Sequence, residues 1–335
     1  MDYYKCIMGS HDDSFVSIFN RQWSRELESH TLNYKAASQM VSGNRLRPII
    51  MAWGYYAGTD TANHMAIAER AVCIELIHKA SILLDDWIDG DIARHGQKTF
   101  HVEYSNEEAV LYAIYLINKS LQLMSKIDRR VFDMLLETVG SMAYGGIREV
   151  SYKSMGDDAV QMVKEIINLE TVSLIKNAFA IGYLTSGMVD MPAAVNNIGH
   201  YMGYCFQLLN DLEPFVYSQK NIEYKGGLNY DANKRRKNIV VAYLYGACTK
   251  KDRALLNEDA DFGRIEQLVS KHKIVKLVLD EVSTYVRLIS DSINEMQPLN
   301  ISIKYMDGFR FFLHTMFSIC FEKLGLSFTD KAFKD

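Results

Sequence analysis

Residues 65–87 read MAIAERAVCIELIHKASILLDDW, and this stretch decides the fold class. Its apolar side chains recur at spacings of three and four residues, which is typical of a helix that turns one face to a protein core. No proline interrupts the chain between Pro48 and Pro192. A β-sandwich or an α/β protein of that length needs many turns, which recruit proline and glycine, whereas long helices do not. The sequence therefore predicts an all-α fold.

The same apolar periodicity continues along most of the chain. It covers residues 108–126, 128–150, 157–188, 193–213, 238–247, 263–296 and 301–324. A polar stretch over residues 218–237 interrupts it and predicts a loop, because it contains Gly226 and Gly227. No internal repeat or low-complexity linker divides the chain. We therefore expect a single domain over residues 1–335, with residues 1–30 as an N-terminal extension.

Composition and charge exclude several classes of protein. With 48% apolar and 23% charged residues, the chain is too apolar to be disordered. A net charge of -4 argues against a general nucleic-acid-binding protein. The five scattered cysteines have no metal-ligand spacing, and the chain has neither a signal peptide nor a long apolar run. These features predict a cytoplasmic protein without a transmembrane segment.

An acidic cluster ends the apolar helix quoted above. Asp85 and Asp89 lie one turn apart on the same helix face, and Asp86 flanks them. Like charges at this spacing destabilise a helix, and negative charge at a helix C-terminus opposes the macrodipole. Such a cluster calls for a compensating cation, and carboxylates without histidine or cysteine suit Mg²⁺ that also binds phosphate. A solvated acidic helix end is the alternative interpretation.

Basic residues occur on both sides of this cluster. Arg94 and His95 follow it, and Arg45 and Arg47 precede the first long helix. Arginine presents a bidentate fork that matches phosphate. These residues are therefore candidates for binding a substrate that carries both metal and diphosphate, whereas ordinary ion pairs and a basic loop are the simpler explanations.

These segments together resemble the trans-isoprenyl diphosphate synthase (polyprenyl synthase) family, within the class I terpene-synthase-like superfamily. SGNRLRP at residues 42–48 resembles its GGKRLRP segment, and DDWIDGDIARHGQKTFH at residues 85–101 resembles its first aspartate-rich motif with the arginine segment that follows. FQLLND at residues 206–211 is similar to the FQxxDD of the second aspartate motif. The resemblance implies an all-α helical bundle around a central cavity, with residues 218–237 as an active-site loop.

The resemblance also implies roles for individual residues. Two or three Mg²⁺ ions would bridge an allylic diphosphate and the acidic clusters, with ligands from Asp85, Asp86, Asp89, Asn210 and Asp211. Arg94 would complete the catalytic set by pairing with the allylic diphosphate. Substrate contacts are implied for Arg45, Arg47, His78, His95, Thr171, Gln207, Arg236 and Lys237. Ala80 and Ser81 fall where the family caps the product cavity, and their small size predicts room for a long chain unless Tyr112 or Tyr115 fills it.

Several positions depart from the family's pattern. Asn44 stands where the family has lysine, His95 where it has arginine, and Glu170 where it has the lysine of a Lys-Thr pair. These losses should weaken the binding of an acceptor diphosphate, because charge-assisted contacts to phosphate are the strong ones. In the second motif Asn210 and Pro214 replace aspartates, which predicts a weaker metal site.

We therefore expect a Mg²⁺-dependent, homodimeric prenyltransferase of isoprenoid biosynthesis. It would ionise an allylic prenyl diphosphate, C15–C20 or longer, and transfer or cyclise the prenyl chain. The altered acceptor positions favour an acceptor other than isopentenyl diphosphate, or a terpene synthase on the same fold. A chain-elongating trans-polyprenyl diphosphate synthase is the first alternative, and a non-catalytic synthase subunit is the second.

Overall fold

The fold comes from a computed structural model, which describes residues 13–28, 40, 43–61, 63–94, 96–216, 238–257, 262–296 and 303–328. His95, Arg236, Lys237 and the loop at residues 218–237 lie outside these ranges, together with the predictions made for them.

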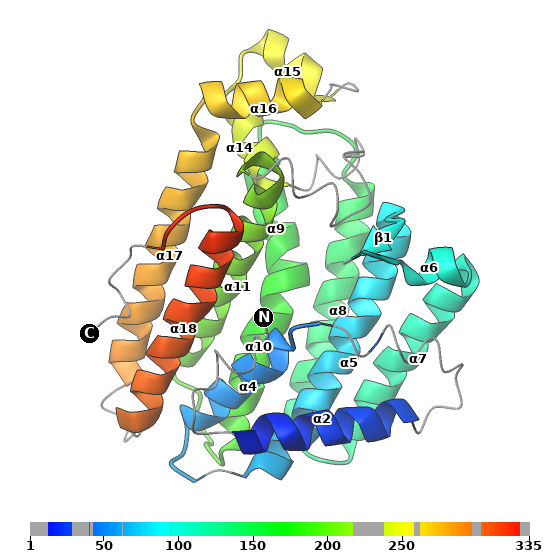
Figure 1. The fold of residues 1–335 in the computed structure, drawn as a ribbon, viewed down its shortest axis with the longest axis vertical. Helices are drawn as coiled ribbons and strands as arrows, with labels where there is room; N and C mark the ends of the chain where they lie inside the picture. The colour runs from blue at the N-terminus through cyan, green and yellow to red at the C-terminus, as the bar shows by residue number, and fades with distance from the viewer. Residues whose placement is uncertain are drawn as a thin grey trace.

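The described chain is helical almost throughout, which confirms the all-α prediction (Figure 1). Its helices are α2 (Asp13–Glu28), α4 (Leu46–Tyr56), α5 (His64–Asp89), α6 (Phe100–Glu103), α7 (Asn106–Ser125), α8 (Arg129–Ser151), α9 (Ala159–Ile167), α10 (Ser173–Thr185), α11 (Ala193–Val216), α14 (Ile239–Ala247), α15 (Lys250–Asn257), α16 (Phe262–Lys271), α17 (Ile274–Met296) and α18 (Ile303–Lys323). A π-helical turn, η2 (Asn168–Val172), joins α9 to α10. Strands β1 (Ala93–Arg94) and β2 (Gln97–Lys98) form a short antiparallel hairpin.

The long helices pack side by side along the long axis of the molecule, with α15 and α16 at one end and α2 lying across the other (Figure 1). Helix α5 packs on α7, α10 on α4 and α11, and α11 on α17. Their shared interior forms one hydrophobic core. Among the described helices, none combines the length and hydropathy needed to cross a membrane.

Helices α4 and α10 approach each other at two glycines. A β-carbon added at Gly54 would lie 2.0 Å from the backbone oxygen of Phe179, and one added at Gly182 would lie 1.9 Å from that of Met51. Neither position accepts a side chain at this spacing, so the two backbones are in direct contact.

Within the segment predicted as an N-terminal extension, residues 13–28 form α2. Its apolar side chains recur every four residues at Phe15, Phe19, Trp23 and Leu27, and all are buried. This stripe packs against α5, so α2 contributes to the core that holds the candidate site.

The helix predicted over residues 263–296 is two helices. Helix α16 ends at Lys271, α17 begins at Ile274, and Lys273 between them has a left-handed backbone with φ of 54°. Apolar periodicity runs through both helices, so the sequence pattern gave no sign of the break. Left-handed lysine is uncommon, and glycine would have been the usual signal for such a turn.

Candidate active site

A cavity of about 1200 Å³ lies within the bundle and brings the two aspartate motifs together. Of the predicted site residues, it is lined by Arg45, Arg47, His78, Ser81, Asp85, Asp86, Asp89, Arg94, Thr171, Gln207, Asn210 and Asp211. Ala80 is fully buried and is not among the lining residues. Segments more than a hundred residues apart in sequence therefore share one site.

The first aspartate cluster occupies the last turn of α5, which ends with Gly90 in a left-handed cap. Asp85 is exposed and Asp89 is half-buried, and both line the cavity. Asp86 is buried and accepts hydrogen bonds at its Oδ1 from Arg94, at 2.8 Å from Nε and 2.5 Å from Nη2. All three carboxylates line the cavity, and among them Asp86 is the one that binds Arg94.

Asp86 and Arg94 each shift the pKa of the other. Burial raises the pKa of Asp86, and the Arg94 guanidinium opposes that rise. The pKa of Arg94 is raised although burial alone would lower it, because Asp86 and Asp85 favour the cation. Arg94 therefore remains charged beside the cavity.

A small hairpin positions Arg94. The residue ends β1, and Gly96 after it has a φ of 75° that favours glycine. The Oγ1 of Thr99 donates to the backbone oxygen of Asp91 at 2.5 Å, and its N–H donates to the oxygen of Ile92. These bonds tie the hairpin to the chain that leaves α5, and they thereby hold Arg94 next to Asp86.

The second motif is built around Asp211, near the C-terminal end of α11. Its Oδ1 accepts from the Nε2 of Gln207 at 2.8 Å, and its Oδ2 accepts from the N–H of Ile239 at 2.9 Å. Gln207 in turn accepts at Oε1 from the hydroxyl of Thr171 at 2.9 Å. Asp211 is buried, so its carboxylate joins α11 to the start of α14.

Asn210 and Glu213 present their side chains to the cavity beside this network. Asn210 is exposed, Glu213 is half-buried, and both line the cavity. They lie three residues apart on α11 and therefore share a helix face. Pro214 lies inside α11 and leaves no carboxylate at the position where the family places an aspartate.

Arg47 and His78 form a basic recess in the cavity wall. Their Nη1 and Nε2 atoms lie 3.0 Å apart. Since a guanidinium only donates, Nε2 of His78 is the accepting, unprotonated nitrogen. Burial holds the pKa of His78 well below its usual value, and Arg47 and Lys79 lower it further. The Arg47 Nε and the His78 Nδ1 are buried without a hydrogen-bond partner among the described residues. Buried donors are nearly always paired, so these two atoms are candidates for binding an anion.

Arg45 is held by protein groups. It pairs with Glu75 at 2.5 Å, donates to the backbone oxygen of Met40 at 3.1 Å, and lies over the ring of Trp23 at 5.0 Å. Both members of the ion pair are almost fully buried. These contacts favour a role for Arg45 in fixing the Gly43–Arg47 segment on α5, and Arg47 lines the cavity beside it.

Lys79 also lines the cavity, and the sequence analysis did not single it out. Its side chain is only 5% exposed, and its Nζ lies 3.3 Å from the place that a β-carbon on Gly43 would occupy. The pKa of Lys79 is lowered to about 8 by burial, against the attraction of Glu75, and Arg45 lowers it further. In sequence its only signal is a lone cation inside an apolar helix, four residues after Glu75, which indicates an ordinary ion pair.

The apolar part of the cavity lies between α5, α7 and α8. Its walls include Leu84, Ile117, Val139 and Met142. Ser81 also lines the cavity, and its role in leaving room for a chain stays a prediction. Phe100 lines the cavity and stacks on Tyr112 at 5.4 Å between ring centroids, while Tyr112 and Tyr115 are not lining residues.

Glu170 reaches the cavity from the π-helical turn η2. Such turns insert one residue into a helix and frequently occur at functional sites. A β-carbon at Gly145 would lie 2.6 Å from the Cγ of Glu170, so the glycine on α8 makes space for this side chain. Lys176 lines a different, smaller pocket and does not replace the family's lysine in the cavity.

The donor atoms that face the cavity fit Mg²⁺. Asp85 and Asp89 on α5 and Asn210 and Glu213 on α11 offer oxygen only, and Mg²⁺ prefers oxygen ligands and retains water or phosphate oxygens. No thiol or imidazole is needed to complete the set. Arg94, Arg47 and Lys79 line the same cavity and are candidates for binding a diphosphate.

Comparisons with known proteins identify the family and the fold. A family model described as "Polyprenyl synthetase" matches residues 30–278. The chain is 26% identical over 218 residues to heptaprenyl diphosphate synthase component 2 of Geobacillus stearothermophilus, covering 64% of this chain and 66% of that protein. Several other curated relatives are matched over about half of their length, at 51% to 57%.

Solved structures share the fold. A heptaprenyl diphosphate synthase from Staphylococcus aureus superposes with a TM-score of 0.76 at 18% identity, covering 94% of this chain and 99% of that chain. A polyprenyl synthase from Caulobacter crescentus, solved with calcium and isoprenyl diphosphate, has a TM-score of 0.76 at 19% identity and covers 89% and 92%. With the family model matching most of the chain, the protein belongs to the polyprenyl synthetase family.

Proposed function

We propose that this protein is a Mg²⁺-dependent trans-prenyltransferase that ionises an allylic prenyl diphosphate and adds the prenyl chain to isopentenyl diphosphate. The observation that carries the proposal is one cavity with three parts: carboxylates on two facing helices, a cluster of cations, and an apolar chamber. Family membership indicates a prenyltransferase, and the relatives' printed names are those of prenyl diphosphate synthases.

Some residues would bind the metal and the diphosphate, and others would shield the allylic cation from water. When bound, Mg²⁺ would neutralise the negative charge that develops on the departing diphosphate. Asp85 and Asp89 would hold the metal from α5, with Asn210 and Glu213 on the α11 side, and Arg94 would bind the departing group. The apolar walls around Ser81 would keep water from the allylic cation until the acceptor's double bond reacts with it. The new cation would then lose a proton to the released diphosphate, which restores a double bond in the product.

Arg47, His78 and Lys79 form the proposed acceptor side. Lys79 projects its ammonium to Gly43, next to the position where Asn44 replaces the family's lysine. We infer that the charge lost at residue 44 is supplied from residue 79. For this reason we favour isopentenyl diphosphate as the acceptor, although the sequence alone favoured other acceptors.

The test is incubation of the purified chain with geranyl, farnesyl or geranylgeranyl diphosphate and Mg²⁺, with and without isopentenyl diphosphate. A longer prenyl diphosphate that forms only when isopentenyl diphosphate is present is the expected product. A hydrocarbon or alcohol formed without it would replace elongation by a terpene synthase, and hydrolysis alone would contradict the acceptor assignment.

A second candidate is ionisation with transfer to a different acceptor. The altered second metal motif supports it, because Asn210 is neutral, Pro214 carries no carboxylate and Asp211 is engaged by Gln207 and Ile239. One relative is named as component 2 of its synthase, so a role as one subunit of a two-component enzyme is the third candidate. Activity that appears only with a second subunit would distinguish it.

The size of residue 81 should set the product length. Ser81→Phe places an aromatic ring in the chamber wall, and we expect the longest product to lose at least one five-carbon unit. Ala80 is fully buried and does not line the cavity, so Ala80→Ser serves as the matched control with an unchanged product. Chromatography of dephosphorylated products measures both variants, and an unchanged length in Ser81→Phe would remove Ser81 from the wall.

We also propose a homodimer formed through α7 and α8. These packed helices expose apolar side chains that a monomer leaves in water: Leu111 is 66% exposed, Ile114 55%, Tyr144 54% and Ile147 63%. Large exposed apolar patches mark association surfaces. The native mass from light scattering should equal two chains, and Leu111→Glu with Ile147→Glu should give one. Leu277→Glu, at an exposed apolar position on α17, is the control and should remain a dimer.

A further inference from the structure

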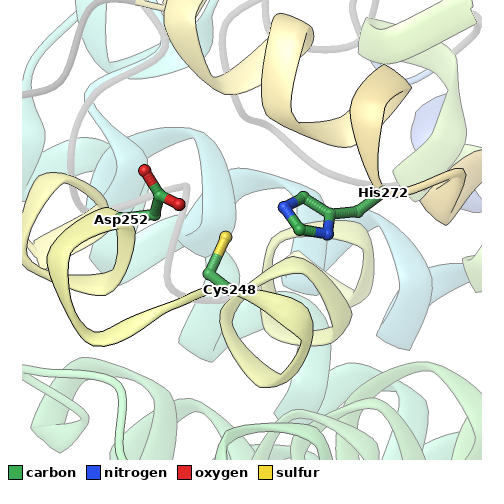
Figure 2. A group of neighbouring side chains, drawn as sticks. All are labelled: Cys248, Asp252 and His272. Carbon is green, nitrogen blue, oxygen red and sulfur yellow. The ribbon is translucent and has the colours of Figure 1, made fainter.

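Three metal-binding side chains converge outside the cavity. A sulfur of Cys248, a carboxylate oxygen of Asp252 and a ring nitrogen of His272 all lie within 4.8 Å of one another. None of the three residues lines the cavity described above. Figure 2 shows the thiol between the carboxylate and the imidazole. Within the described residues this is the one such group of three or more.

The backbone holds each residue at the end of a helix. Cys248 caps the C-terminus of α14, where its N–H donates to the oxygen of Leu244. His272 follows α16, and its N–H donates to the oxygen of Leu268 at 2.9 Å. The left-handed Lys273 then turns the chain into α17. The negative ends of two helix dipoles are therefore near the cluster, and they favour a bound cation.

Asp252 is oriented by its own helix start. The hydroxyl of Thr249 donates to the Oδ2 of Asp252 at 3.0 Å, and the N–H of Asp252 donates back to that hydroxyl at 3.3 Å. This capping arrangement fixes the carboxylate at the start of α15 and leaves its other oxygen available. A ligand that is already held by a second hydrogen bond is typical of metal sites.

One ring nitrogen of His272 lacks a hydrogen-bond partner among the described residues. Its Nε2 is buried without a hydrogen-bond partner, and no hydrogen bond joins the three side chains among the described residues. Buried polar atoms in native structures are nearly always paired, so an orphaned nitrogen next to a thiol and a carboxylate needs an explanation. A metal ion would satisfy all three groups together.

The charges around the cluster are compatible with a cation. Burial and then Asp252 raise the pKa of the Cys248 thiol, while Lys271 and Arg253 lower it. Arg253 is engaged elsewhere, because it pairs with Asp157 at 2.5 Å and lies 4.8 Å over the ring of Tyr245.

We propose that Cys248, Asp252 and His272 form a zinc site. One thiolate, one imidazole and one carboxylate suit Zn²⁺, whereas Mg²⁺ takes oxygen ligands. In a tetrahedral zinc site the ligand atoms are roughly 3.3–3.8 Å apart, so small side-chain rotations would close the present spacing. Three protein ligands leave a fourth position for water. The ion would tie α14 and α15 to α16 at the end of the bundle.

The experiment uses the full chain, stripped with a chelator and then titrated with Zn²⁺ against a chromophoric competitor. One zinc per chain should bind, and the melting temperature should rise. Replacement by Co²⁺ should give the visible bands of a tetrahedral ion and a near-ultraviolet thiolate-to-cobalt band. Mg²⁺ in excess should displace neither metal. Failure to bind zinc against the competitor would overturn the proposal. Binding of Co²⁺ without the thiolate-to-cobalt band would also overturn it.

Variants separate this site from other thiols. Cys248→Ser should weaken zinc binding by more than about 100-fold and remove the thiolate band, and Asp252→Asn and His272→Asn should weaken binding as well. Cys320→Ser is the matched thiol control and should bind zinc as the parent chain does. Circular dichroism checks that each variant is folded. Equal zinc affinity in Cys248→Ser and the parent chain would show that the ion binds elsewhere.

Discussion

Asp85→Asn is expected to reduce prenyl transfer by a factor of at least about 10³, the largest loss of any single substitution in the cavity. The carboxylate faces the cavity on the last turn of α5, and a metal ion at such a position supplies several kcal/mol of charge stabilisation to the departing diphosphate. The measurement is the rate of diphosphate release from farnesyl diphosphate, with and without isopentenyl diphosphate.

Two controls make this result specific. Asp133→Asn removes a carboxylate from the exposed surface of α8, where it pairs with Arg129, and should leave the rate unchanged. Asp86→Asn should cost less than Asp85→Asn, because Asp86 is buried and acts through Arg94. The dependence on Mg²⁺ should move to higher concentration in Asp85→Asn. Full activity of that variant at the parent Mg²⁺ concentration would remove Asp85 from the metal site.

Lys79→Met is expected to raise the KM for isopentenyl diphosphate by about 10- to 100-fold, with little change in the KM for the allylic substrate. The estimate follows from about 1.5–3 kcal/mol for a hydrogen bond to a charged group. Methionine keeps the length and flexibility of the side chain in its buried position. Glu75 keeps its partner, because Arg45 binds it at 2.5 Å, so the variant should fold.

The same lysine should give the acceptor reaction a pH dependence. Its pKa is about 8, so the ammonium is present below that pH and is lost above it. The KM for isopentenyl diphosphate should therefore rise as the pH increases through about 8. Lys79→Arg should remove this rise, because arginine remains charged in this range.

A rescue experiment tests whether residue 79 replaces residue 44. Asn44→Lys in the Lys79→Met background returns the cation to the family's position and should lower the KM toward the parent value. If Lys79→Met changes both substrates equally, or if the rescue has no effect, the lysine does not act on the acceptor.

The helical class and the outline of the site were accessible from the sequence because their signals are local. Periodicity along residues 65–87 and the spacing of Asp85 and Asp89 depend only on helix geometry. The single domain and the roles of the site residues remain predictions, although the described residues among them do line one cavity, apart from Ala80.

The partners of individual charges could not be predicted from spacing alone. Asp86 and Arg94 meet because a hairpin folds back on α5, and Asp211 meets the N–H of Ile239, 28 residues later in the chain. Glu75 binds Arg45, 30 residues earlier in the chain, and the Nζ of Lys79 lies 3.3 Å from the place that a β-carbon on Gly43 would occupy. Each case depends on a contact between segments, which periodicity does not describe.

The glycine contacts between α4 and α10 limit how the cavity can change shape around prenyl chains of different length. At Gly54 and Gly182 backbone touches backbone, and no side chain is present there to change rotamer. Helix α4 carries Arg47, and α10 continues from the turn that carries Thr171. Van der Waals contact between the two backbones therefore limits how closely these helices can approach. We expect adaptation to chains of different length to come from the opposite walls, where flexible side chains such as Met142 border the chamber.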